Sequence, residues 1–136
     1  MIKNFLFPKN TYNTITSIAL LILRIAFAGM LVTHGWDKLT NFEAMSQGFL
    51  GGSIGLSLTV FAEFFCALGV VVGLLYRLAL IPMIINMSVA FIMVHHLKLV
   101  GPGNGELAFL YLVVFVVLML TGSGKYAIDS FLSLKK

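Results

Sequence analysis

Charge is scarce in this sequence. Only 10% of its 136 residues are charged and 60% are hydrophobic, whereas ordinary soluble domains carry about 25% charged residues. Too few polar groups are present to cover a surface in water, so the composition predicts an integral membrane protein with one domain over residues 1–136. The net charge of +4 is too thinly spread to indicate nucleic acid as a partner; the expected surroundings are a lipid bilayer.

Cysteine is nearly absent as well. The single Cys66 excludes an intrachain disulfide, a Cys-x-x-Cys redox pair and a cysteine zinc site. It lies inside an apolar segment, where a thiol packs like a small hydrophobic group. We therefore predict no metal.

Four apolar segments occupy most of the chain. Each approaches the roughly 20 residues that cross a hydrocarbon core of about 30 Å, and helices are the spanning form because lipid offers the backbone no hydrogen-bond partners. The connections are brief, so successive helices should pack antiparallel, and small residues such as Gly29 and Gly35 should allow close approach. The predicted fold is all-α, an integral membrane antiparallel four-helix bundle. Its predicted spans are residues 15–36, 54–76, 78–97 and 106–121.

The first external loop should contain a short amphipathic helix. Leu39, Phe42, Met45 and Phe49 recur at about one helical turn, with polar residues between them. This pattern is typical of a helix lying at a membrane surface. The predicted interfacial helix covers residues 39–50.

The basic residues indicate the orientation. With both termini on one side, that side holds six lysines and arginines and the other side holds two. The positive-inside bias then predicts cytoplasmic termini in a bacterial-type inner membrane. The six are Lys3, Lys9, Arg77, Lys125, Lys135 and Lys136, and the two are Lys38 and Lys98.

Three strongly polar side chains fall inside the apolar segments: Arg24, Glu63 and Asn86. A rise of about 1.5 Å per residue gives them similar depths on three successive helices. Arginine in hydrocarbon costs at least about 2.5–3.5 kcal/mol, so we expect a partner and predict Glu63. Two interpretations stay open. The group is either a structural ion pair that fixes helix register, with Asn86 as a bridge, or the floor of a cavity for a polar head group or a proton.

A second polar cluster is predicted near the outer face, formed by His34, Lys38, His95, His96 and Glu106. At about 100° per residue, Lys38 shares a helix face with Arg24, and at most one of His95 and His96 faces the bundle. A carboxylate beside imidazoles and an ammonium can take up and release protons near neutral pH. Facing histidines could instead bind haem or a metal, although no attachment motif is present, or simply anchor the helix ends.

Several short motifs follow one another in order. They are Leu23-Arg24, His34-Gly35-Trp36-Asp37-Lys38-Leu39, Ala62-Glu63, Leu74-Leu75-Tyr76-Arg77-Leu78-Ala79, Gly103-Asn104-Gly105-Glu106-Leu107 and Gly122-Ser123-Gly124-Lys125-Tyr126-Ala127-Ile128-Asp129. Through them, residues 17–134 resemble the DoxX family of small four-helix membrane proteins. The resemblance implies a bundle with an amphipathic outer loop. It also implies a link to quinone-coupled oxidoreductases, including systems of terminal quinol oxidation and thiosulfate:quinone oxidoreduction, or to redox-stress complexes; many relatives have no known activity.

We therefore expect a subunit or component of a quinone-linked membrane system that binds a quinone or similar lipid-like molecule between its helices. The candidate ligand-binding residues are Arg24, Glu63, Asn86, His34, Lys38, His95, His96 and Glu106. Whether the chain itself catalyses a reaction stays open. One alternative is a non-catalytic subunit or assembly factor that binds other redox subunits or a second copy of itself. Another is an oligomeric conduit for protons or small solutes.

Overall fold

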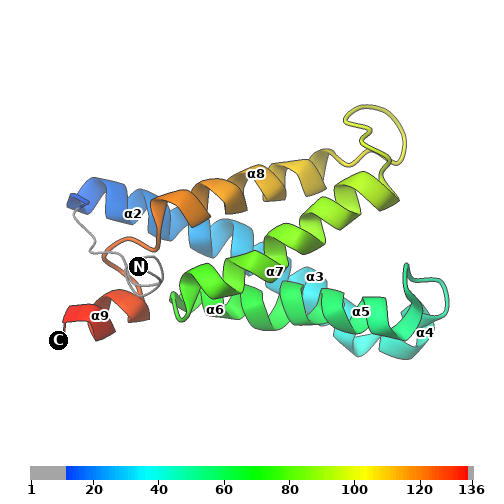
Figure 1. The fold of residues 1–136 in the computed structure, drawn as a ribbon, viewed down its shortest axis with the longest axis horizontal. Helices are drawn as coiled ribbons and strands as arrows, with labels where there is room; N and C mark the ends of the chain where they lie inside the picture. Colours follow the sequence, from blue (N-terminus) through cyan, green and yellow to red (C-terminus); the bar gives the residue numbers. More distant parts are fainter. Residues whose placement is uncertain (1–11, 135–136) are drawn as a thin grey trace.

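Helices make up all the regular structure in the computed structural model, which describes residues 12–134 and has no strand among them. Three continuous helices are apolar and long enough to cross a membrane, namely Thr14–Thr40, Gly52–Val72 and Tyr76–Val94. A fourth apolar helix, α8 (Glu106–Thr121), has 16 residues and is therefore about 24 Å long. Figure 1 shows the four lying across one another, with the short helix α9 (Ile128–Leu134) after α8.

The first long helix begins at Thr14, where the Asn13 side chain accepts a hydrogen bond from the backbone N–H of Thr16 at 2.8 Å. Such a cap satisfies one of the N–H groups that a helix start leaves without a partner. The helix runs on to Thr40, beyond the predicted edge at Trp36, because polar residues can continue a helix that has left the apolar run. It comprises α2 (Thr14–Leu23), η1 (Arg24–Ala28) and α3 (Gly29–Thr40).

The predicted surface segment, residues 39–50, is helical over a shorter stretch. It contains the end of α3, then α4 (Phe42–Ser46), and then turns that lead to Gly51. The second long helix ends at Val72, earlier than the predicted Tyr76, because Gly73 follows it with a φ of +74°. It comprises α5 (Gly52–Val60), η2 (Phe61–Cys66) and α6 (Ala67–Val72). The third comprises α7 (Tyr76–Val89) and η3 (Ala90–Val94).

Each of the three long helices contains one π-helical stretch, labelled η. A π turn holds one residue more than an α turn and is often found at functional sites. Arg24 opens η1 and Glu63 lies within η2. The π stretches therefore coincide with two of the residues that the sequence singles out.

The second and third long helices converge at one end and diverge at the other. In Figure 1, α7 starts beside the end of α6 and moves away from α5 until it ends near the start of α8. At the convergent end the space between helices is filled by large side chains, each at most 2% exposed: Tyr76, Leu80, Met83, Phe115 and Leu118. The divergent end has no such filling between α5 and α7, and the cavity described below lies there.

Gly35 allows α3 to lie directly against η2. A Cβ atom at this position would be 2.7 Å from backbone atoms of Glu63 and Phe64, closer than side chains pack. The predicted close approach at Gly35 is confirmed. The same prediction for Gly29 was wrong, because a Cβ atom there would have no neighbouring atom within 4 Å.

Candidate functional site

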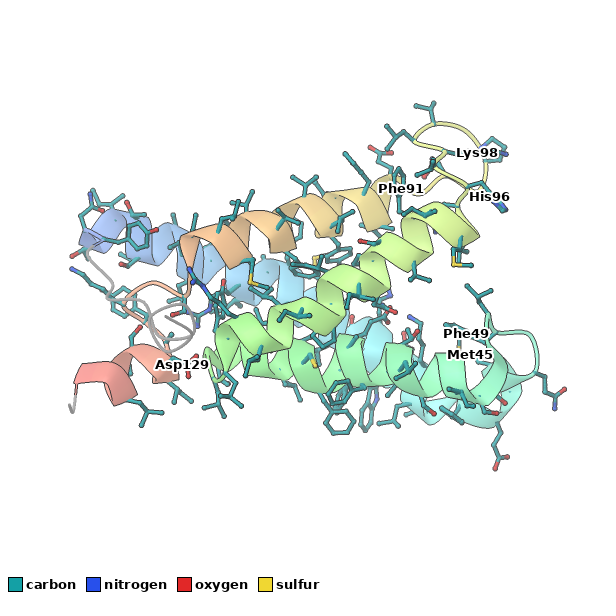
Figure 2. The ribbon with its side chains drawn as sticks, viewed as in Figure 1. Met45, Phe49, Phe91, His96, Lys98 and Asp129 are labelled. Atoms are coloured by element: carbon teal, nitrogen blue, oxygen red, sulfur yellow. The ribbon has the colours of Figure 1, made fainter. Side chains whose placement is uncertain are left out.

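A cavity of about 1100 Å³ occupies the divergent end of the helices. Its walls come from α3, the α5–η2 and α7–η3 segments and α8, and most of the lining is apolar. Several lining residues are also more than half exposed, among them Leu58 at 65%, Phe61 at 51% and Ile85 at 58%. The cavity therefore opens sideways between α5–η2 and α7. Figure 2 shows Met45 and Phe49 on one of the diverging limbs and Phe91 and His96 on the other.

Polar side chains meet on the cavity wall around Glu63. Its Oε2 atom accepts a hydrogen bond from Nζ of Lys38 at 2.5 Å, forming an ion pair, and its Oε1 atom accepts one from Nδ2 of Asn86 at 3.0 Å. Oδ1 of Asn86 accepts in turn from Oγ1 of Thr59 at 3.1 Å. All four residues line the cavity. Because the two charges are paired, the network is polar without adding net charge to an apolar cavity.

Tyr111 also lines the cavity, although its hydroxyl oxygen is enclosed. Its ring lies edge-on to Phe27, with centroids 5.8 Å apart, and stacks on Phe115 at 5.7 Å. The residue is 2% exposed, and its hydroxyl has no hydrogen-bond partner within the described part of the chain. It interacts electrostatically with Glu63. A buried hydroxyl without a partner costs about 1–3 kcal/mol.

The structure brings the predicted outer cluster together only in part. His34, Lys38 and His95 line the cavity, and Nδ1 of His95 lies 3.0 Å from the carbonyl oxygen of Gly103. His96 and Glu106 are exposed and are not part of the lining. The expectation that at most one of the two adjacent histidines faces the bundle is confirmed, and that one is His95.

Backbone geometry explains why the other two residues lie outside. The helix ends at Val94, and His96 has a φ of +49°, which turns the chain away from the cavity; Figure 2 shows His96 on the loop beyond the opening. Glu106 begins α8, and its neighbours Leu107 and Ala108 form the lining instead. The prediction that Glu106 faces the entrance was therefore wrong, and His96 is the one of the two histidines that lies outside it.

Arg24 does not pair with Glu63, and that prediction was wrong. The side chain is 1% exposed, and its Nε and Nη2 atoms donate to the carbonyl oxygens of Val70 at 3.2 Å and Val71 at 2.9 Å. These carbonyls belong to the last turn of α6, where a helix runs out of its own N–H donors, and the Val70 carbonyl also accepts from the backbone N–H of Gly73 at 3.2 Å. Arg24 therefore caps the end of the second long helix.

The same guanidinium also holds the segment that follows α8. Its Nη1 atom donates to the carbonyl oxygens of Ser123 at 2.6 Å and Tyr126 at 3.0 Å. The group lies over the ring of Tyr76, 5.7 Å from its centroid. Arg24 thus connects three parts of the chain with one planar group, which suits its fixed set of donors.

Asp129 completes this arrangement at the convergent end, where Figure 2 labels it. Its carboxylate accepts hydrogen bonds from the backbone N–H groups of Leu75 at 3.0 Å and Tyr76 at 2.8 Å. It thereby caps the start of α7, where a negative charge also suits the helix dipole. Asp129 also lies within electrostatic range of Arg24, while the hydrogen bonds of its carboxylate go to backbone N–H groups.

Helix register accounts for the separation of Arg24 from Glu63. The contact between Gly35 and the backbone at Glu63 brings Lys38 opposite that carboxylate. Val70, which Arg24 contacts, is seven residues further along the second helix, or about 10 Å. The predicted depths assumed that the apolar runs end in common planes. Both Arg24 and Lys38 do face the second long helix, but at different levels.

The sequence model of the DoxX family matches residues 19–96. The chain belongs to the DoxX family. A protein of Haemophilus influenzae, described as uncharacterized, is 30% identical over 122 residues, which cover 82% of this chain and 88% of that relative. No solved structure matches the chain. The matched range of the DoxX domain includes Lys38, Glu63 and Asn86, whereas Tyr111 lies beyond it.

Two polar residues of this DoxX-family site were not identified from the sequence. Thr59 precedes Glu63 by one helical turn and therefore shares its face, a signal that was available. Tyr111 is the one side chain with a polar group between Glu106 and Thr121, which also marks it out. Among residues 12–134, no three His, Cys, Asp or Glu side chains come together as a metal site would require.

Proposed function

We propose that this DoxX-family protein lies in the bacterial inner membrane as an antiparallel four-helix bundle, with cytoplasmic termini and α4 at the outer surface. Its α2 start and α9 lie at the same end in Figure 1, as an even number of crossings requires. The positive-inside bias favours a cytoplasmic location for that end. At the other end, the charge of Lys38 is neutralised by Glu63.

Within this bundle the cavity binds a quinone, and the protein serves as the quinone-binding component of a membrane oxidoreductase. One observation carries this proposal: an apolar cavity of about 1100 Å³ has the Lys38–Glu63–Asn86 network on its wall. Ligand pockets commonly measure about 300–1,000 Å³ and combine apolar walls with a few polar groups. A quinone ring with the first part of its tail suits such a space.

The donors of the network suit carbonyl oxygens. The ammonium of Lys38 carries three hydrogens and the amide of Asn86 two, and each group donates one to Glu63. The remaining N–H groups of both side chains are donors of the type that a quinone carbonyl accepts. The sideways opening near Phe61 and Ile85 gives an isoprenoid tail a route into the lipid.

A conduit across the membrane is less well supported. Most of the cavity lining lies in the divergent half, and the convergent half is filled by side chains at most 2% exposed, including Tyr76, Leu80, Met83 and Phe115. A non-catalytic subunit would instead keep the Lys38–Glu63 pair only to fix helix register. This alternative predicts a stable protein partner and no ligand.

Quinone binding to detergent-purified protein tests the proposal. Organic extracts of the wild-type protein should contain quinone, and decylubiquinone should bind to the stripped protein. Glu63→Gln should weaken that binding about tenfold, because Glu63 holds the donors Lys38 and Asn86 in place and the displacement of one donor from the quinone costs about 1.4 kcal/mol. Glu106→Gln makes the same chemical change outside the cavity and should have no effect. Quinone-free extracts together with no decylubiquinone binding by the wild type would refute the proposal, and a co-purifying partner insensitive to Glu63→Gln would favour the subunit alternative.

A further inference from the structure

Helix α9 turns apolar side chains outward and polar side chains toward the bundle. Ile128, Phe131 and Leu132 are 41%, 61% and 52% exposed, whereas Asp129 and Ser130 are 4% and 6% exposed. At about 100° per residue, the three apolar side chains share one arc of the helix and the two polar ones lie on the other side. A surface helix of a protein in water has the reverse arrangement.

The contacts of α9 with the bundle fix this orientation. The carboxylate of Asp129 caps α7, and its backbone N–H donates to the carbonyl oxygen of Gly73 at 2.9 Å. Ala127 lies so close to Gly73 that a Cβ atom there would collide with its side chain. The hydroxyl of Ser130 donates to the carbonyl oxygen of Gly124 at 2.6 Å. The helix therefore cannot rotate its apolar side inward without losing these contacts.

The apolar side of α9 is near other exposed apolar side chains. Figure 1 shows α9 just beyond the turn between α6 and α7. In this turn Leu74 and Leu75 are exposed, and the backbone N–H of Leu75 donates to Asp129 at 3.0 Å. Leu78, one helical turn further on, is also exposed and belongs to a helix long enough to cross a membrane. The surface that this helix offers to lipid therefore reaches the start of α9.

Lipid fits this side of α9 better than a protein does. The helix has seven residues and is therefore about 10 Å long, too short to cross the hydrocarbon. A stable protein interface needs about 800 Å² from each partner, supplied by about 20–30 residues, and three apolar side chains fall far short of that. Lys135 and Lys136 follow in the sequence, and lysines beside a membrane are attracted to its anionic lipids.

We propose that α9 is a lipid-binding helix that lies in the membrane interface, with Ile128, Phe131 and Leu132 among the acyl chains. Helices of this kind bury their apolar side about 5–10 Å into the boundary between headgroups and acyl chains. Because Asp129 also caps α7, the depth of α9 sets the level at which the third long helix begins. The inference is independent of the cavity and of its ligand.

A fluorescent probe on α9, in vesicles that contain nitroxide-labelled phosphatidylcholine, tests this placement. The full-length protein carries Cys66→Ala, which removes its one native cysteine, and Phe131→Cys labelled with the environment-sensitive dye NBD. Its emission should shift to the blue, and a nitroxide near the headgroup should quench it more than one at the chain end. Lys125→Cys, an exposed polar position just before α9, is the control and should be quenched less by both nitroxides.

The folding of each variant is checked before labelling. Both cysteine variants should unfold in SDS at the same concentration as Cys66→Ala alone, because Phe131 and Lys125 are exposed. If neither nitroxide quenched the label at Phe131, the proposed lipid contact would be overturned; shielding of that label from aqueous iodide would then identify a protein partner on this side. Stronger quenching from the chain end would overturn the interfacial position. Binding of decylubiquinone is measured separately, so its failure would overturn the proposed function and leave the role of α9 standing.

Discussion

Replacing Arg24 with lysine should lower stability without affecting ligand binding. The guanidinium reaches four backbone carbonyls, two at the end of α6 and two after α8. Lysine keeps the charge but places its three hydrogens on a single nitrogen. One atom cannot stay within hydrogen-bond distance of Val70 and Val71 and also of Ser123 and Tyr126.

The size of the effect follows from the bonds that would be lost. We expect lysine to retain at most two of the four bonds. A hydrogen bond to a charged group contributes about 1.5–3 kcal/mol, so the loss of two at the lower value lowers the free energy of unfolding by about 3 kcal/mol. Arg24→Met would leave all four carbonyls without the guanidinium and should cost more, although it also removes the penalty of burying a charge.

Unfolding of detergent-solubilised protein by increasing SDS provides the assay. Trp36 is the only tryptophan, and its ring centroid lies 5.7 Å from that of Phe64, so its fluorescence reports separation of α3 from η2. Decylubiquinone binding should be measured in parallel on the folded fraction. Wild-type stability of Arg24→Lys would refute the capping role. If Arg24→Lys had normal stability but bound quinone more weakly, Arg24 would belong to the ligand site after all.

Two further predictions use the same titration. Lys38→Met and Glu63→Gln should each lower the free energy of unfolding by about 2–3 kcal/mol, somewhat less than the loss of a fully buried partner because the lysine side chain is 19% exposed. The double variant should be more stable than the sum of the two losses predicts, because neither charge is then left unpaired. Additive losses would mean that the two side chains are not coupled. Gly35→Ala should lower the free energy of unfolding by about 1–3 kcal/mol, because the added methyl group forces α3 away from η2. Gly29→Ala should leave that free energy unchanged or raise it by up to about 1 kcal/mol. Equal effects of the two alanines would show that Gly35 does not set the helix spacing.

The sequence predicts the helical character and the family of this protein because both depend on local patterns. Apolar runs of sufficient length form helices in lipid whatever their neighbours do. Glu63 and Asn86 could also be placed together, since each is a strongly polar side chain in such a run. The partner of Glu63 could not, because Lys38 lies beyond the apolar run of the first segment and the register that brings it inward depends on the Gly35 contact.

Arg24 was misplaced for a related reason. Its acceptors are backbone carbonyls, which every residue carries, so no residue type in the sequence marks them. A search for a compensating side chain favours the nearest carboxylate in an apolar run, Glu63. The carboxylate that lies near Arg24 belongs to Asp129, in a polar stretch after α8 that shows no sign of folding back onto the helices.

The contacts of Arg24 also have a consequence for insertion of the chain into the membrane during its synthesis. The first long helix contains Arg24, yet two of its acceptors, Ser123 and Tyr126, are translated after α8. Until then the nascent chain carries a charge at membrane depth with an incomplete set of partners, a state that costs about 2.5–3.5 kcal/mol or more in hydrocarbon. The first helix should therefore stay beside the insertion machinery, or tilt to keep its arginine in water, until synthesis is nearly complete. Release of the chain into the bilayer then coincides with closure of its convergent end.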